Sequence, residues 1–240
     1  MRSRTRASRT SGFTLIELAI VLAVVAILSA AAVTSLSRGK TRASLLGATT
    51  ELASLLHQAR QTALGTGTPV AVLLYKGYSA PGSGATGYAI VYQDACFDFF
   101  TGGATCGVTY ATYDPSVLAF GTSGTTKSAV LDTMALPPGV IVGPATGMGT
   151  GTALRAPIAG IPVDVDCSFC GATGGAVVFD ASGQASFYSL AGGSQTGPLA
   201  VNGGASVSLG YDTAVTPDLT GQRTLVILSA SGVVRLLAGG

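Results

Sequence analysis

The longest apolar run of the chain lies close to its N-terminus. From Thr10 to Ser37, 28 residues carry a single charged side chain, Glu17. About 20 apolar residues suffice to cover the hydrocarbon core of a bilayer. Neither Gly nor Pro interrupts residues 13–37, so helix propensity favours one continuous helix. The pattern therefore predicts a transmembrane helix over residues 13–37.

A secretory signal peptide is the alternative interpretation of this run. Such a peptide has an apolar region of about 7–15 residues followed by a small-x-small cleavage site. Ser29-Ala30-Ala31 offers that site, but the run is longer and contains Glu17 near its start. A charge at the centre of a membrane helix costs about 2.5–3.5 kcal/mol on insertion scales and marks a functional position. The sequence therefore favours a retained helix.

Apolar positions continue at helical spacing beyond the run, at Leu45, Leu52, Leu55, Leu56, Ala59 and Ala63. Gly65, Gly67 and Pro69 then stop the helix. We therefore expect residues 38–65 to form an amphipathic continuation that packs on a globular head.

Short apolar runs separated by Gly, Pro, Ser and Asp fill residues 66–240 and predict strands. The expected strands are Val70–Tyr75, Tyr88–Tyr92, Val117–Phe120, Val140–Val142, Ala176–Phe179, Ala185–Tyr188, Thr224–Leu228 and Val233–Leu236. The last four form two hairpin-like units. The expected fold class is thus α+β, with a long N-terminal helix packed on a mostly antiparallel β head.

The segment Gly12-Phe13-Thr14-Leu15-Ile16-Glu17 resembles the processing site of type IV prepilins and type II secretion pseudopilins. In that family a basic leader ends in Gly, Phe follows, and Glu stands fifth in the mature chain. The resemblance makes residues 1–12 the leader and implies that a prepilin peptidase cuts after Gly12 and methylates Phe13. Glu17 would face the Phe13 amine of a neighbouring subunit, where low dielectric strengthens the attraction.

Basic residues flank the apolar run almost equally, with four Arg before it and three basic residues after it. The positive-inside rule therefore gives weak support for either orientation. The resemblance implies a cytoplasmic leader and a single pass of the inner membrane. The head would then lie in the periplasm, or at the cell surface within a filament.

Softer motifs resemble the GspH/FimT branch of pseudopilins. They are the segment Glu51–Arg60 with its Ala-Arg end, the turn Phe179–Gly183 and the strand Gly232–Arg235. The resemblance covers residues 12–74 well and 175–237 loosely. The Gly- and Thr-rich residues 78–174 have no role that the resemblance assigns.

Four cysteines, Cys96, Cys106, Cys167 and Cys170, stand in the expected head. An oxidising compartment favours disulfides, and we expect the pairs Cys96–Cys106 and Cys167–Cys170. Crossed pairing of the two clusters remains open. A zinc knuckle or a redox motif at Cys167-x-x-Cys170 is a further reading, although strong zinc sites pair two such knuckles.

Charge gives little support for nucleic acid as a partner. The net charge is +2, from 13 basic and 11 acidic residues, but the leader holds four of the basic ones. Its removal leaves 9 − 11 = −2. Arg223 and Arg235 are weak candidates for a DNA patch, because phosphate binding relies on clustered Lys and Arg.

The sequence holds one His, no Trp and no active-site motif, so we expect no enzyme, no cofactor and no metal. The expected function is a filament subunit, a pseudopilin of a type II secretion system that helps export proteins. A minor pilin of a type IV pilus, including a DNA-binding one of natural transformation, is the alternative. Expected partners are the prepilin peptidase, other pilin or pseudopilin subunits, the inner membrane and an exported protein.

Overall fold

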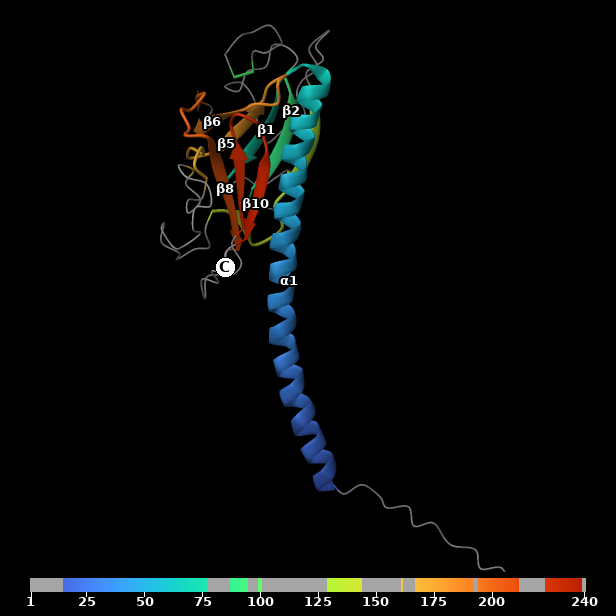
Figure 1. The fold of residues 1–240 in the computed structure, drawn as a ribbon. Helices are drawn as coiled ribbons and strands as arrows, with labels where there is room; N and C mark the ends of the chain where they lie inside the picture. Colours follow the sequence, from blue (N-terminus) through green and yellow to red (C-terminus); the bar gives the residue numbers. More distant parts are fainter. Residues whose placement is uncertain are drawn as a thin grey trace, which may run out of the picture. The chain divides into compact units, whose positions relative to one another are not determined.

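The computed structural model describes residues 15–76, 87–94, 99–100, 129–143, 161, 167–191, 194–211 and 223–238. The chain divides into two compact units, Met1–Thr41 and Arg42–Gly240. The described residues form one helix, α1, and ten strands, β1 to β10 (Figure 1).

Helix α1 spans Leu15–Thr66 and runs through both units. It ends where Gly67 adopts a φ of 69° and its N–H bonds to the carbonyl of Ala63 at 2.9 Å. This left-handed cap needs a glycine, and Pro69 prevents the helix from resuming. Among the described residues, no helix has the length and hydropathy needed to cross a membrane.

The second unit contains two antiparallel sheets. Sheet A has the strand order β3-β2-β1-β5-β6-β7. Its strands are β1 (Val70–Tyr75), β2 (Tyr88–Gln93), β3 (Ala129–Ala135), β5 (Gly174–Phe179), β6 (Ala185–Ala191) and β7 (Ser194–Thr196). Sheet B has the order β10-β9-β8-β4, with β4 (Val140–Val142), β8 (Gly204–Tyr211), β9 (Arg223–Leu228) and β10 (Val234–Ala238). The predicted α+β class with antiparallel strands is confirmed.

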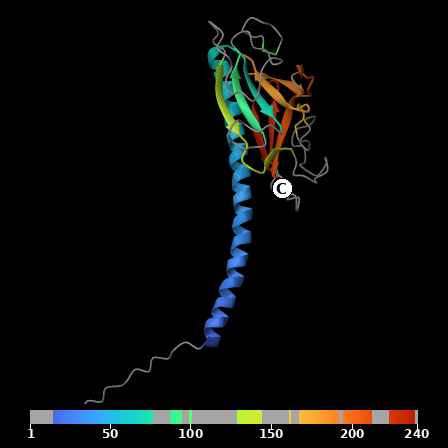
Figure 2. The ribbon, with the colours of Figure 1, turned by 180° about the vertical axis from the view of Figure 1, so that it is seen from behind.

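One core joins both sheets to the part of α1 that lies in this unit (Figures 1 and 2). All six helix positions predicted from the spacing are buried, at 4% exposure or less. They pack with alternate residues of both sheets, such as Val72 of β1 and Val207 of β8. An amphipathic helix thus covers two sheets at once, which requires a wide apolar stripe.

Sheet A is buried on its other face as well. Ala71, Leu73 and Tyr75 of β1 belong to a second cluster with Tyr92 and Phe99. Because both faces are covered, β1 has an unbroken apolar sequence, VAVLLY, instead of an alternating one. This explains why β1 is conspicuous in the sequence.

Gly232 lies where the β9–β10 turn contacts the β5–β6 turn, and its replacement tests how closely these two turns pack. Gly232 has a φ of 60°, and a Cβ there would lie 2.1 Å from the Gly183 carbonyl oxygen. Gly203 has a similar φ of 81° but nothing within 4 Å. Both Gly→Ala changes strain the backbone, whereas only Gly232→Ala adds a collision. We expect Gly232→Ala to lower the free energy of unfolding by about 1–3 kcal/mol more than Gly203→Ala.

Urea denaturation of the two variants, followed by far-ultraviolet circular dichroism, measures this difference. Equal losses of stability would show that the two turns are not held in contact.

Candidate functional site

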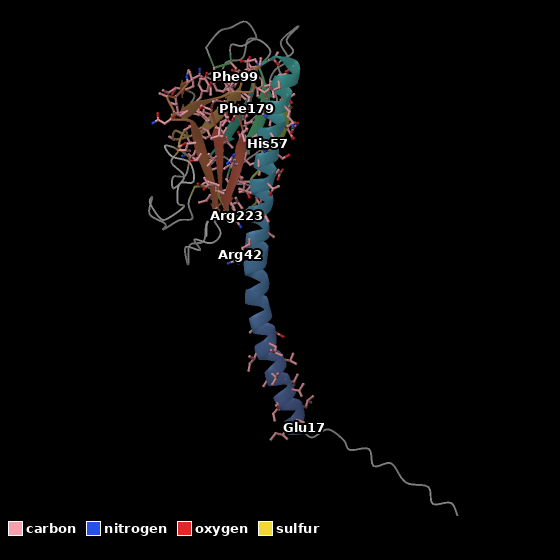
Figure 3. All side chains as sticks on the ribbon, viewed as in Figure 1. Glu17, Arg42, His57, Phe99, Phe179 and Arg223 are labelled. Atoms are coloured by element: carbon pink, nitrogen blue, oxygen red, sulfur yellow. A yellow bond between two sulfur atoms is a disulfide. The ribbon has the colours of Figure 1, made fainter. Side chains whose placement is uncertain are left out.

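The N-terminal part of α1 carries the residue with the sharpest sequence prediction. Glu17 is the third residue of the helix and is exposed (Figure 3). A carboxylate in the first turn is favourable because it faces the positive end of the helix dipole. Gly12 and Phe13, the predicted processing residues, lie outside the described residues.

The same part of the helix is apolar on every side. All side chains from Leu15 to Ala30 are exposed, and its large apolar side chains have exposed fractions of 49% to 89%. A helix that is apolar all round is stable only in apolar surroundings, such as lipid or other helices. The first unit therefore has the surface of an assembly or insertion segment, with one carboxylate near its start.

Residues 7–33 match the family model of the prokaryotic N-terminal methylation motif. The chain carries a type IV pilin-like leader. The match includes Gly12, Phe13 and Glu17, and it supports a pilin-like subunit that is processed by a prepilin peptidase and assembles with other pilin subunits. Comparison with curated proteins and with solved structures found no match to the chain.

In the head of this pilin-like chain, Arg60 joins two turns to the helix. Its Nε donates to the carbonyl oxygens of Ser231, at 2.9 Å, and Gly183, at 3.4 Å. Ser231 lies in the β9–β10 turn and Gly183 in the β5–β6 turn, so one side chain ties α1 to both sheets. The three segments that carry the softer sequence motifs therefore meet at one place, which we call the Arg60 junction.

The Arg60 junction is reinforced by the turns themselves. Asp180 Oδ1 accepts hydrogen bonds from the backbone N–H of Ser182 and Gln184, at 2.8 and 3.0 Å. The N–H of Ala185 donates to the Ser229 carbonyl at 2.8 Å, which links the two turns directly. These segments lie far apart in the chain, and in the structure they satisfy one another's polar groups.

Cys167 and Cys170 form a disulfide, with 5.3 Å between their Cα atoms. The loop that it closes contacts β8 of sheet B, where Ser168 N–H donates to the Ser206 carbonyl at 2.9 Å. Phe169 between the two cysteines is buried, with its ring centroid 5.4 Å from that of Phe187 in sheet A. The disulfide therefore shapes a second link between the sheets.

The other candidate ligands do not form a metal site in the described part of the chain. Within it, no three His, Cys, Asp or Glu side chains come together in a way that could hold a metal ion. His57 is exposed on α1 (Figure 3). Cys96 and Cys106 lie outside the described residues, so their pairing stays a prediction.

Arg223 and Arg235 do not make one patch. Arg235 pairs with Val226 across the β9–β10 ladder, and cross-strand partners point to the same face of a sheet. Val226 packs with Ile161 on the face of sheet B away from α1. Arg223 lies two and four residues before Leu225 and Ile227, so its side chain points to the same face as theirs, which packs in the core with α1. The two arginines thus lie on opposite faces, and the predicted pairing of them as a DNA patch is not supported by the geometry.

An aromatic cluster on the outer face of sheet A was missed by sequence analysis. The ring centroids of Tyr92 and Phe99 lie 4.6 Å apart, and those of Phe100 and Tyr188 lie 4.5 Å apart. The buried Asp94 carboxylate accepts the N–H of Phe99 at 3.1 Å. Burial raises the pKa of Tyr188 above its ordinary value. Part of the unassigned region 78–174 therefore builds core: the predicted strand Tyr88–Tyr92 supplies one side of the cluster, and Phe99 and Phe100 pack against it.

Removal of the guanidinium at the Arg60 junction tests its contribution. Arg60→Met keeps an apolar stem but removes the donor shared by two carbonyls. We expect a loss of about 1.5–3 kcal/mol in the free energy of unfolding, as for hydrogen bonds to charged groups. Arg235→Met, at an exposed arginine of β10, is the matched control and should stay within about 0.5 kcal/mol of the parent. Urea denaturation of both variants measures the two free energies of unfolding. Equal values would show that the Arg60 guanidinium does not stabilise the fold.

Proposed function

We propose that the chain is a subunit of a prepilin-type filament, and more specifically a pseudopilin of a type II secretion system. The observation that carries the proposal is the methylation motif at residues 7–33, with Gly, Phe and Glu at the positions that processing and assembly require. The proposed role is structural: the subunit builds a short periplasmic filament that helps move folded proteins outward. No enzymatic activity is part of the proposal.

The proposed mechanism begins at the inner membrane. The prepilin peptidase removes residues 1–12 and methylates the new amine of Phe13. The helix over residues 13–37 crosses the membrane once before assembly; the side chains of its last part, from residue 31 on, are outside the described set. Its apolar surface then exchanges lipid for the helices of neighbouring subunits, at little cost because both surroundings are apolar.

Glu17 supplies specificity within this apolar assembly. An isolated carboxylate in low dielectric is costly, and pairing with the positive Phe13 amine of a neighbour relieves that cost. A subunit that is out of register would leave both charges unpaired. The pair therefore selects one axial stagger between neighbouring helices.

The Arg60 junction supports placement in the GspH/FimT branch. The Ala-Arg end of the helix, the Phe179–Gly183 turn and the Gly232–Arg235 strand are the motifs of that resemblance. Their contact through Arg60 gives them a common structural purpose in this chain. A minor pilin of a type IV pilus is the second candidate, because the same motif serves both systems. A DNA-binding pilin is disfavoured by the separation of Arg223 from Arg235.

A Glu17→Ala subunit should be processed and inserted normally but incorporated poorly into filaments, because its amine partner loses the opposite charge. Glu51→Ala is the matched control, since Glu51 is an exposed carboxylate of the same helix within the second unit. We expect recovery of Glu17→Ala in sheared filaments to fall at least about tenfold, the effect of one charge pair of 1.4 kcal/mol or more. Glu51→Ala should match the parent.

Mass spectrometry of the mature N-terminus belongs to the same experiment. Methyl-Phe13 is expected in all three proteins. An uncut N-terminus in the parent would remove the filament proposal altogether, whereas normal incorporation of Glu17→Ala would remove only the role of Glu17.

Deletion of the gene should reveal which filament system the subunit serves. We expect loss of exoprotein secretion with twitching motility and transformation retained, and restoration of secretion by the complementing gene. Loss of twitching with secretion intact would favour the minor pilin instead. Loss of transformation alone would favour a DNA-uptake pilin.

A further inference from the structure

The Cys167–Cys170 disulfide of the second unit joins two cysteines that are only 3 residues apart in the chain. In the chain-entropy account, a disulfide stabilises the folded state more when it closes a longer loop. This bond closes a short loop and does not link two distant segments. Other contacts therefore hold the loop on the two sheets.

Hydrogen bonds hold the first half of the loop on β8 of sheet B. Cys167 pairs with Val207 in an isolated antiparallel bridge. The Ser168 N–H donates to the Ser206 carbonyl at 2.9 Å, and the Ser206 N–H donates to the Ser168 Oγ, also at 2.9 Å. None of these bonds involves a sulfur atom, so they do not depend on the disulfide.

Apolar packing holds the second half of the loop on sheet A. Phe169 is 1% exposed, and its ring centroid lies 5.4 Å from that of Phe187 in β6. The ring lies on the backbone of Gly175 in β5, where a Cβ would be 2.6 Å from the ring Cδ2. Just after the loop, the Gly171 N–H donates to the Gly174 carbonyl at 2.7 Å. Both halves of the loop are thus anchored by contacts that remain when the S–S bond is broken.

These anchors keep the two cysteines together in the reduced chain as well. They hold the Cα atoms of Cys167 and Cys170 5.3 Å apart, within the usual range for a disulfide. Groups that are held in a reactive geometry behave as if they were at high concentration, so the S–S bond re-forms between the same two thiols. The loop therefore supports a cycle of opening and closing in which the head stays folded.

The surroundings of the two sulfurs differ, although both cysteines are partly exposed. The Cys170 sulfur lies over Gly175 of β5, where a Cβ would be 2.9 Å from it. Because the sheet covers this sulfur on one side, an external thiolate has less access to it, and access is one of the factors that set the rate of thiol–disulfide exchange. Cys167 is therefore the expected point of attack.

We propose that the Cys167–Cys170 disulfide is a reversible thiol–disulfide exchange site, and that its partner is a protein dithiol of the thioredoxin type. The site shares no residue with the processing and assembly motif, so it does not depend on the filament role. In this exchange the chain is the substrate of the partner.

The exchange has two steps, which together move two electrons and two protons. A thiolate of the partner attacks the Cys167 sulfur, and an S–S bond forms between them as the Cys167–Cys170 bond breaks. The electron pair of the broken bond stays on the Cys170 sulfur, which takes up a proton. The second thiolate of the partner then attacks the partner's own sulfur in the mixed disulfide. This attack releases the Cys167 thiolate, which takes up a proton, and leaves the partner oxidised to a disulfide.

Trapping with a defined partner tests this exchange. The probe is a thioredoxin whose second active-site cysteine is replaced by serine, so that a mixed disulfide is not resolved once it has formed. The full chain in detergent micelles is incubated with the probe, and peptide mass spectrometry identifies the cysteine that carries it. We expect the adduct on Cys167. Its rate of formation should not change with urea below the unfolding transition, because the folded chain is the species that reacts.

Single-cysteine variants compare the two sulfurs directly. Cys170→Ser leaves the Cys167 thiol, and Cys167→Ser leaves the Cys170 thiol. We expect Cys170→Ser to form a mixed disulfide with oxidised glutathione at least about fivefold faster than Cys167→Ser, because access governs the rate. Reduction of the parent with dithiothreitol should leave its far-ultraviolet circular dichroism unchanged, and re-oxidation should restore the same pair.

Four results would overturn the proposal. The first is the lack of an adduct on Cys167, or an adduct on Cys170 in its place. The second is a trapping rate that rises with urea in parallel with unfolding, because exchange would then require the unfolded chain. The third is loss of the folded spectrum on reduction, because the disulfide would then be a permanent cross-link that the fold requires. The fourth is equal rates for the two single-cysteine variants.

Discussion

The packing of one stripe of α1 against both sheets is the constraint on which the second unit depends. Leu52, Leu56 and Ala59 are buried together with residues of sheet A and of sheet B. Neither sheet buries this core alone. Each sheet contributes one face, and α1 covers the apolar side chains that the two sheets leave exposed. Ala59 and Ala63 are fully buried, so small side chains at these positions let the helix lie close to the residues that cover it. Loss of the stripe would therefore expose two sheets at once.

Apolar packing does not fix the turns at the end of this core, because their backbone groups are polar. The Arg60 junction does so with hydrogen bonds between segments that are far apart in sequence. The Cys167–Cys170 disulfide closes a local loop, whose Ser168 N–H donates to the Ser206 carbonyl of β8. Gly183 and Gly232 have positive φ at the Arg60 junction, and the absence of a Cβ leaves room for Arg60, since a Cβ would lie 3.3 Å from its Nε at Gly183 and 3.0 Å from its Cδ at Gly232. Hydrogen bonds, which are directional, thus fix how these turns sit against α1. The non-directional hydrophobic effect gives little preference for one arrangement of the turns over another.

Much of the fold follows from local patterns in the sequence. The helix stripe is predictable because its apolar periodicity is strong, and strands such as β1 and β4 are predictable because they are short, unbroken apolar runs. Strand β8, Gly-Ala-Ser-Val-Ser-Leu-Gly-Tyr, is not among the expected strands because Gly and Ser interrupt its apolar residues. Its buried Ser208 hydroxyl is hydrogen-bonded to the Thr224 hydroxyl of β9 at 2.8 Å, a contact that only the tertiary structure supplies. Strand β3, Ala-Val-Leu-Asp-Thr-Met-Ala, includes good helix formers and became a strand through pairing with β2. The expected strand Val117–Phe120 lies outside the described residues.

The candidate sites likewise divide into residues that a local sequence pattern predicts and residues that only the fold brings together. Gly12, Phe13 and Glu17 are predictable because they belong to a short linear motif, and the family match over residues 7–33 includes all three positions. Arg223 and Arg235 were placed together by their proximity in sequence, yet strand phase sends them to opposite faces. Arg60 became meaningful only when its partners, 123 and 171 residues away, were brought to it by the fold. Long-range geometry of this kind has no local signature.

Helix α1 has two kinds of surface along its length, and each suits different surroundings. From Leu15 to Leu28 it is apolar on all sides, whereas from Leu45 to Ala63 it buries one stripe and exposes the rest. An all-apolar surface is indifferent to whether lipid or another helix covers it, so that part can change partners. A stripe matched to two sheets cannot change partners without unfolding the head. The two parts of the helix thus have surfaces that suit different surroundings.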